Sequence, residues 1–243
     1  MNRLRITPSI VPNMFTAMNM FCGFVSIINA SSGQYNYAAW LIIIAAIFDT
    51  LDGWMARLTK SSSALGVQLD SLSDLVSFGV APAYLIYKVN LIAYNEIGII
   101  ISSLLMIAGG FRLARFNVQL VGFDKTFFTG LPIPSSAITI ATFIIAFYDN
   151  TRKEFIPSVI IFIIPMVLIL SFLMVSRVKY DTLPHFRKQE FKEKPYFYLV
   201  PVIVAALIIF FPLKWVLFIL FVLMILFGIF RHLYSLLSSK KLI

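Results

Sequence analysis

Residues Asp49 to Asp74 read DTLDGWMARLTKSSSALGVQLDSLSD, and they contain four of the 11 acidic residues of the whole chain. Strongly apolar sequence lies on both sides, YAAWLIIIAAIF before the stretch and LVSFGVAPAYLIY after it. Aspartates in such surroundings are costly unless they are paired or bound to a ligand, and they usually carry function. The four aspartates of this stretch are therefore candidates for a functional site.

The composition of the chain is that of a membrane protein. Of its 243 residues, 60% are hydrophobic and 13% are charged, and the mean hydropathy is +0.90. In a soluble domain, roughly a quarter of the residues are charged. The formal net charge of +9 could indicate a nucleic-acid partner, but the basic residues lie between apolar spans, as in the loops of membrane proteins. We therefore expect an all-α polytopic membrane protein that binds membrane lipids and no nucleic acid.

Eight apolar spans can be distinguished along the chain. They cover about residues 11–30, 37–60, 64–88, 96–116, 133–149, 155–177, 196–211 and 213–236. Spans of about 20 residues match a hydrocarbon core that is about 30 Å thick. The sequence therefore predicts about eight transmembrane helices.

The basic residues predict the orientation of these helices. Most of the 20 lysines and arginines fall on the side that holds both termini, and the positive-inside tendency assigns that side to the cytoplasm. Residues 178–195 are expected to form a basic cytoplasmic loop between a membrane core at 1–177 and two further helices with a basic tail at 196–243. We expect a multi-pass protein of the cytoplasmic membrane.

The four aspartates form two pairs, each on one face of a helix. Asp49 and Asp52 are spaced i, i+3, whereas Asp70 and Asp74 are spaced i, i+4. The centre between the pairs falls in the serine run at residues 61–63, where a polar turn and a serine N-cap are expected. A helical hairpin folded there places both pairs at one depth, up to about 15 Å from the turn. Packed helices lie about 8–10 Å apart, so the four carboxylates can converge.

Four converging carboxylates need positive charge between them. Like charges at that distance oppose one another's ionisation, and two divalent cations would neutralise four aspartates. Carboxylate oxygens suit hard cations such as Mg²⁺ or Mn²⁺, and Mg²⁺ usually completes its coordination with water and substrate phosphates. The alternative, in which two aspartates cap helices and two face solvent, leaves the matched depth unexplained. We therefore expect a site for two divalent cations.

The residues between the aspartates suit a substrate that contains phosphate. Gly53 and Ala56 leave one helix surface bare, and Gly66 does the same on the facing helix. Arg57 lies one turn after Gly53 and can reach a phosphate oxygen. Small residues also serve helix–helix packing, which is the alternative for Gly66 taken alone.

The stretch as a whole resembles a known signature. It matches the pattern D-x2-D-G-x2-A-R-x8-G-x3-D-x3-D at every fixed position, which is similar to the signature of the CDP-alcohol phosphatidyltransferase family. Four further segments look like the phosphatidylserine synthase branch of that family, and together they cover about residues 8–140. These segments are PNMFTAMNMFCGFVS, SDLVSFGVAPA, GGFRLARFN and FTGLPIPSSA.

The resemblance implies a membrane enzyme with a six-helix catalytic core, commonly homodimeric, whose site opens to the cytoplasm. It would transfer the phosphatidyl group of CDP-diacylglycerol to L-serine and release CMP. The site residues implied by the resemblance are the metal ligands Asp49, Asp52, Asp70 and Asp74, of which Asp74 is also the base, and the nucleotide-site residues Gly53, Ala56 and Gly66.

Polar residues outside the signature are further candidates. On the first span, Asn13, Thr16 and Asn19 recur at i, i+3 and i+6. They could face the nucleotide or hydrogen-bond to neighbouring helices, and we place Asn13 and Thr16 at the nucleotide. These two residues and Arg57 complete the expected nucleotide and diphosphate site.

A zwitterionic acceptor such as serine needs a cation for its carboxylate. The segment GGFRLARFN offers Arg112 and Arg115, spaced i, i+3, and Asn117 could add an amide hydrogen bond. The arginine fork matches a carboxylate with two parallel bonds. Alternatively, the two arginines anchor the helix end among lipid headgroups, or they bind a phosphate of the lipid substrate or of the acceptor.

Other functions are compatible with buried acids. An ion-coupled transporter also places charges within the membrane, but it predicts inverted repeats and broken helices, and no repeat is visible here. A membrane scaffold gives no reason for the fixed spacing. Within the family, glycerol 3-phosphate or an inositol derivative is the alternative acceptor.

Overall fold

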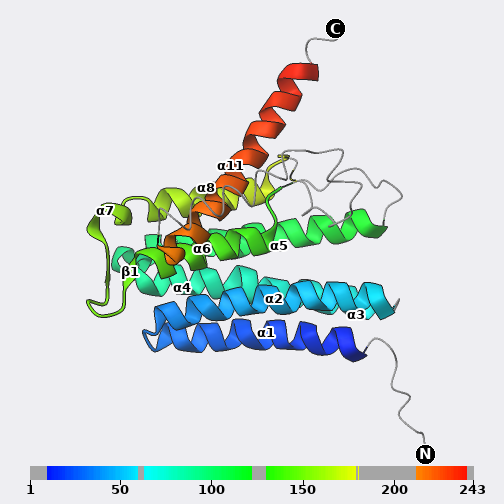
Figure 1. Cartoon of the computed structure of the whole chain (residues 1–243), viewed down its shortest axis with the longest axis horizontal. Coiled ribbons are helices and arrows are strands. Elements are labelled where there is room, and N and C mark those ends of the chain that lie inside the picture. The colour runs from blue at the N-terminus through cyan, green and yellow to red at the C-terminus, as the bar shows by residue number, and fades with distance from the viewer. Residues whose placement is uncertain (1–9, 60–62, 122–129, 179, 181–211, 240–243) are drawn as a thin grey trace, which may run out of the picture.

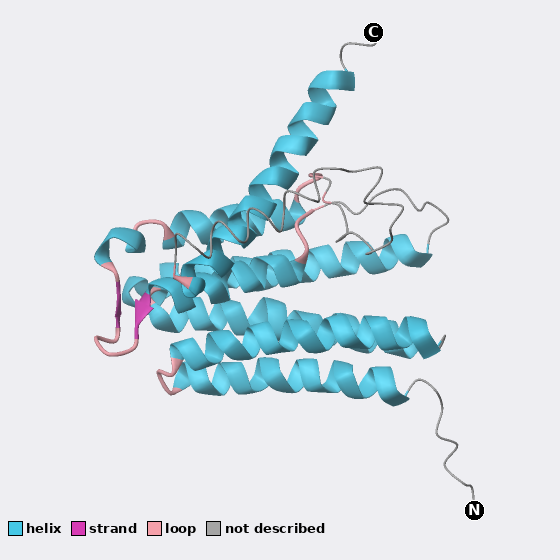
Figure 2. Cartoon of the chain, in the orientation of Figure 1, coloured by secondary structure: helices cyan, strands magenta, loops and turns pink. Residues whose placement is uncertain are grey.

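The computed structural model describes residues 10–59, 63–121, 130–178, 180 and 212–239. This part of the chain is almost entirely helical, apart from one small two-stranded hairpin (Figure 2). Six helical stretches in it are long and apolar enough to cross a membrane: Ile10–Ser31, Tyr35–Thr59, Leu65–Val89, Leu91–Val118, Pro157–Val175 and Lys214–Tyr234. The prediction of an all-α polytopic membrane protein is confirmed.

The first two helices form a tightly packed antiparallel pair. Helix α1 spans Ile10–Ser31 and helix α2 spans Tyr35–Thr59. Gly33 in the turn between them has a φ of +78°, which only glycine adopts freely. Within the pair, the hydroxyl of Ser26 donates a hydrogen bond to the main-chain oxygen of Ala38 at 2.8 Å.

The third predicted span has the expected extent but is not uniformly α-helical. Helix α3 covers Ala64–Asp74, a π-helical segment covers Leu75–Val80, and helix α4 covers Ala81–Val89. At the end of the π-helical segment, the main-chain N–H of Ala81 bonds to the oxygen of Val76, five residues earlier. Pro82 has no N–H to donate and its ring crowds the carbonyl four residues before it, so the regular ladder is interrupted here.

Helix α5 spans Asn95–Val121 after a 3₁₀ turn at Leu91–Tyr94. Helix α6, Ile133–Phe147, has only 15 residues. The predicted span ran to residue 149, but Tyr148–Asp149 (β1) pairs antiparallel with Glu154–Phe155 (β2) instead. This hairpin satisfies main-chain groups at the point where the apolar pattern of α6 gives way to the polar sequence DNTRKE.

The sixth predicted span, 155–177, is also interrupted. Helix α7 covers Pro157–Ile160 and helix α8 covers Ile163–Val175. Pro165 cannot bond to the carbonyl of Ile161, and its ring crowds that carbonyl, so a continuous helix through this point is disfavoured. The predicted span is nevertheless confirmed, because Pro157–Val175 as a whole is long and apolar enough to cross a membrane.

Helix α11, Leu213–Ser239, confirms the last predicted span and packs against α6. Aromatic rings form much of this contact, because Phe143 and Phe147 of α6 both stack at an edge against Phe218. The indole N–H of Trp215 donates to the main-chain oxygen of Ala146 at 3.2 Å. The predicted span 196–211 lies outside the described residues, so the total of eight helices stays a prediction.

The helix bundle has two well-separated ends. Figure 1 shows α1, α2, α4 and α5 running side by side, with α3 at one end of the bundle and β1 at the other. Fully buried apolar side chains fill the space between the helices, among them Ile42 of α2, Phe78, Leu85 of α4 and Ile140 of α6. Since α2 ends and α3 begins at the same end, the aspartates of both helices are brought to that end.

Candidate active site

The connection between α2 and α3 has the cap that the sequence predicted. Ser63 is the N-cap of α3, with an extended backbone at φ −124° and ψ 152°. Its hydroxyl oxygen accepts a hydrogen bond from the main-chain N–H of Gly66 at 3.0 Å. This bond satisfies a helix N–H that has no partner within the helix. The start of α3, and with it the depth of its aspartates, is therefore fixed.

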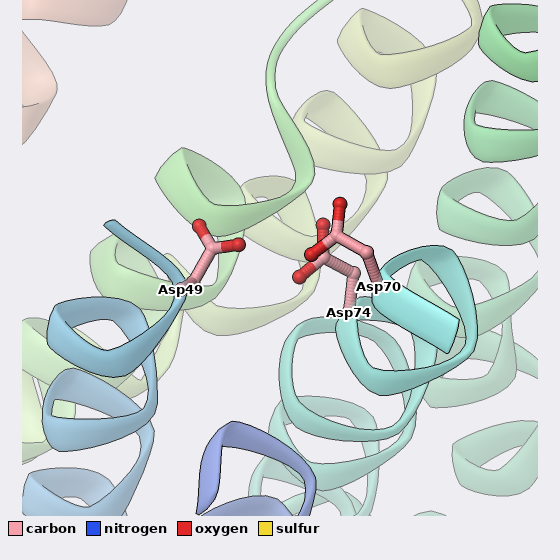
Figure 3. A group of neighbouring side chains, drawn as sticks. All are labelled: Asp49, Asp70 and Asp74. Carbon is pink, nitrogen blue, oxygen red and sulfur yellow. The ribbon is translucent and has the colours of Figure 1, made fainter. Parts of the chain in front are cut away.

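Three of the four aspartates converge as predicted. Ligand oxygens of Asp49, Asp70 and Asp74 all lie within 4.8 Å of one another. Figure 3 shows Asp49 extending from α2 toward Asp70 and Asp74 on α3. Asp49 and Asp74 interact electrostatically across the two helices. We call these three residues the carboxylate cluster.

Asp52 lies next to this cluster without joining it. It is 5% exposed, and its Oδ2 accepts a hydrogen bond from the hydroxyl of Thr16 on α1 at 2.9 Å. Asp52 still interacts electrostatically with Asp49 and Asp70. The structure thus places all four predicted acids in one region but gives Asp52 a protein partner.

The carboxylate cluster fits a divalent cation. The Oδ1 atom of Asp70 is buried and has no hydrogen-bond partner among the described residues. An unpartnered buried carboxylate oxygen is costly, and three carboxyl groups in mutual contact repel one another when ionised. A hard cation with a preference for oxygen ligands, such as Mg²⁺ or Mn²⁺, relieves both costs.

The residues predicted for the nucleotide line the same end of the bundle. A side chain at Gly53 would meet only the guanidinium of Arg57, with the nearest atom at 3.8 Å, so this helix surface is open. Gly66 faces the side-chain oxygen of Asn13, which would lie 3.4 Å from an added Cβ. Asn13 and Gly66 are therefore neighbours across α1 and α3, and Ala56 lies half-buried on α2.

The two arginines of α5 have different surroundings. Arg112 is close enough to Asp74 to attract its carboxylate, and its Nε is buried without a hydrogen-bond partner among the described residues. Arg115 instead donates to the main-chain oxygens at the end of α8, at 3.0 Å to Val175 and 3.4 Å to Met174. Residues three apart are rotated by about 60° around a helix, so the two guanidinium groups diverge.

Asn117 also has a protein partner. Its Nδ2 donates to the hydroxyl of Ser71 on α3 at 2.9 Å, and that hydroxyl lies 3.2 Å from its Oδ1. This pair connects α5 to the helix that carries Asp70 and Asp74. The structure therefore places Arg112 beside the carboxylate cluster, and Arg115 and Asn117 in contacts between helices.

The sequence left open a hydrogen bond from Asn19 to a neighbouring helix without naming Asp74 as its partner, and it did not predict the role of Gly130. The amide of Asn19 donates to Asp74 Oδ1 at 3.3 Å, although the i, i+3, i+6 spacing of Asn13, Thr16 and Asn19 had already marked this helix face. Gly130, with a φ of +92°, lies so close to Arg115 that an added Cβ would be 2.8 Å from its Nη2. Both the positive φ and the close approach of the Met174 main chain at the end of α8 favour glycine at this position.

Fold and site together define a helical membrane protein with a cluster of acidic side chains near one end of the bundle. The family model of the CDP-alcohol phosphatidyltransferases matches residues 9–230. The chain belongs to the CDP-alcohol phosphatidyltransferase family.

Individual relatives are similar over most of their length. The CDP-diacylglycerol–serine O-phosphatidyltransferase of Helicobacter pylori (strain ATCC 700392 / 26695) is 35% identical over 209 residues, which cover 84% of this chain and 83% of the relative. The archaetidylserine synthase of Methanothermobacter thermautotrophicus is 40% identical over 184 residues, or 74% of this chain and 73% of the relative. The CDP-diacylglycerol–serine O-phosphatidyltransferase of Bacillus subtilis is 34% identical over 183 residues, or 73% of this chain and 92% of the relative.

Proposed function

We propose that the protein transfers the phosphatidyl group of CDP-diacylglycerol to L-serine, giving phosphatidylserine and CMP. The observation that carries this proposal is the carboxylate cluster, in which oxygens of Asp49, Asp70 and Asp74 lie within 4.8 Å of one another. The cluster occurs in a chain of the CDP-alcohol phosphatidyltransferase family, and the relatives named for serine as acceptor support this choice of acceptor.

The reaction forms one bond to phosphorus and breaks another. The serine hydroxyl oxygen attacks the phosphorus that carries the diacylglycerol, and the bond from this phosphorus to the bridging oxygen of CMP breaks. CMP leaves with the electron pair, and Asp74 takes the proton of the hydroxyl as general base. Two divalent cations, Mg²⁺ or Mn²⁺, held by Asp49, Asp52, Asp70 and Asp74, would neutralise the charge that develops on the leaving group.

The bare surfaces at Gly53 and Gly66 would admit the nucleotide and the diphosphate close to the backbone. Arg57 would contact a phosphate oxygen, and Ala56 keeps the surface of α2 open between Gly53 and Arg57. Asn13, which faces Gly66, and Thr16, which holds Asp52, would border the same substrate from α1.

Arg112 is the proposed partner of the serine carboxylate. Its unpartnered Nε and its proximity to Asp74 suit a group that holds the acceptor beside the base. Arg115 and Asn117 stay predicted members of the acceptor site. Because both already have hydrogen-bond partners on other helices, α8 for Arg115 and α3 for Asn117, substitution of these two residues is the most stringent test of the acceptor site.

The proposal includes the orientation of the protein in the cytoplasmic membrane. The end of the bundle that carries Arg57, Arg112 and Arg115 would face the cytoplasm, with both termini on that side. The lipid tails of the substrate can then stay in the bilayer while the reaction takes place at its surface. Residues 1–177 would form the catalytic core, followed by the basic loop and the last two helices, in a protein that acts as a homodimer.

The test is an acceptor panel with purified protein. CDP-diacylglycerol and Mg²⁺ or Mn²⁺ are mixed with serine, glycerol 3-phosphate or an inositol derivative, and CMP release is measured. We expect CMP release with serine and not with the other two acceptors. The assay is repeated with a CDP-linked archaeal-type lipid to determine which lipid tail the protein prefers. Release with another acceptor would replace serine in the proposal, while no release together with ion-coupled uptake into liposomes would favour a transporter.

A further inference from the structure

Asn19 contacts the proposed base from a helix outside the α2–α3 hairpin. Its side chain is fully buried at 0% exposure, and its Nδ2 donates to Asp74 Oδ1 at 3.3 Å. Two further carboxyl groups, those of Asp49 and Asp70, lie within the same cluster, and the guanidinium of Arg112 attracts Asp74 from α5. Asn19 is therefore a neutral hydrogen-bond donor to one oxygen of a carboxylate that has both acidic and basic neighbours.

The main chain of α1 is fixed against α3 and the π-helical segment at the level of Asn19. The main-chain oxygen of Asn19 accepts a hydrogen bond from the hydroxyl of Ser77 at 2.8 Å. One turn earlier, the oxygen of Thr16 accepts from the hydroxyl of Ser73 at 2.9 Å. A Cβ at Gly23 would lie 2.7 Å from the Cα of Ser77, so the helices touch here. The position of Asn19 relative to Asp74 is thus set by the backbone.

The other half of the Asn19 amide supports a role in function. Its Oδ1 is buried without a hydrogen-bond partner among the described residues. Leaving a buried acceptor unsatisfied is costly, whereas an apolar side chain of similar size would avoid that cost. Packing alone therefore does not favour asparagine at this position, and the contact of Nδ2 with Asp74 supplies a reason for it.

We propose that Asn19 is a positioning residue that sets the orientation of the Asp74 carboxylate for proton transfer. A carboxylate can rotate about its bond to Cβ, and a hydrogen bond to Oδ1 restricts that rotation. Because the amide is neutral, it orients the carboxylate without cancelling the charge that makes it a base. The inference rests on the proposed function, in which Asp74 accepts the proton of the serine hydroxyl.

The test is a double-mutant cycle of Asn19→Leu and Asp74→Asn in the full-length protein. The four proteins are assayed for release of radiolabelled CMP with serine, so that slow variants stay measurable. Asn19→Leu should lower kcat about 10- to 100-fold in the Asp74 background, since small displacements of reacting groups can cost that much. In the Asp74→Asn background, Asn19→Leu should lower kcat less than about twofold, because the carboxylate through which Asn19 acts is absent.

Measurements besides activity separate positioning from folding. Asn19→Leu should keep the KM for CDP-diacylglycerol, the Mn²⁺ affinity measured by electron paramagnetic resonance, and the melting temperature. The control Ser26→Ala removes another fully buried hydrogen bond of α1, to the oxygen of Ala38, and should leave kcat unchanged. If Asn19→Leu does not fold, Asn19→Ala is used in its place.

Three results would overturn the inference. They are an unchanged kcat in Asn19→Leu, an equal loss in both Asp74 backgrounds, and failure of both Asn19 variants to fold, which would make Asn19 a purely structural residue. A wild-type protein that releases no CMP with serine contradicts the proposed function instead. The cycle is then measured with the acceptor that supports release.

Discussion

Buried hydroxyl groups behave differently in two regions of this molecule. In the first region, formed by α1, α2 and α3, they bond to a different helix, as Ser26 does to the oxygen of Ala38 and Ser73 does to the oxygen of Thr16. The hydroxyl of Thr16 lies 3.2 Å from the oxygen of Pro12 in its own helix and 2.9 Å from Asp52 of α2. In the second region, formed by α6, α8 and α11, they bond back to their own helix. Thr139 donates to the oxygen of Ser135 and Ser171 to that of Val167, four residues earlier in each case.

The difference distinguishes a site from a packing core. A hydroxyl that bonds to its own helix is satisfied wherever that helix lies, so it imposes no geometry on its neighbours. The second region is then held by ring packing, such as Phe143 and Phe147 against Phe218. A hydroxyl that bonds across helices fixes one helix relative to another. In the first region this fixation holds acidic groups close together in spite of their repulsion.

The largest expected effect follows from removing the cations or their ligands. We expect EDTA, or Asp70→Asn in the first region, to lower turnover by more than about 10³-fold, since metal stabilisation of developing charge is worth several kcal/mol. Addition of Mg²⁺ or Mn²⁺ should restore the chelated enzyme. The measurement is CMP release with and without added metal.

The matched control for this test is Asp149→Asn. Asp149 lies at the opposite end of the bundle, where its carboxylate accepts from the main-chain N–H of Thr151, and its replacement should leave turnover unchanged. Full activity in the presence of EDTA would contradict the prediction of a metal site. The two regions would then not differ in function as proposed.

The next largest effect concerns the base. Asp74→Asn should lower kcat by about 10²–10⁴-fold, the usual cost of losing a general base, with little change in the binding of CDP-diacylglycerol. Separate titrations of kcat and of lipid binding check this. A loss of affinity as large as the loss of rate would show Asp74 to be chiefly a metal ligand.

A smaller effect separates the two arginines of α5. Arg112→Lys should raise the KM for serine about tenfold, because lysine cannot form the two parallel bonds of the fork, while the affinity for CDP-diacylglycerol stays the same. Arg115→Lys should mainly lower the melting temperature, since Arg115 holds the oxygens of Val175 and Met174. An equal rise in the serine KM for both variants would place Arg115 in the acceptor site after all.

The smallest effect compares one hydroxyl from each region. Thr16→Val removes the donor to Asp52, and we expect a loss of about 1–3 kcal/mol in the free energy of unfolding and a several-fold rise in the KM for CDP-diacylglycerol. Thr139→Val removes a bond within α6 and should change neither activity nor stability by more than about 0.5 kcal/mol. Equal effects of the two substitutions would mean that the distinction between the regions has no energetic basis.

The sequence by itself determined the features that depend on local spacing. Composition and apolar runs predicted a helical membrane protein, because main-chain groups in a bilayer must be satisfied within each segment. The spacing of the aspartates around residues 61–63 predicted a hairpin that brings carboxylates together, and Ser63 caps α3 as expected. The signature predicted the family, since its eight positions lie within a single hairpin.

Only the tertiary structure decided how the helices are rotated and shifted against one another. Arg112 and Arg115 share a motif, yet one lies beside Asp74 and the other at the end of α8. Asp52 lies one turn from Asp49 but bonds to Thr16 of α1, and no spacing within α2 predicts that partner. Helical periodicity tells which residues share a face of one helix, whereas the residue that the face meets depends on close packing with segments far away in the sequence.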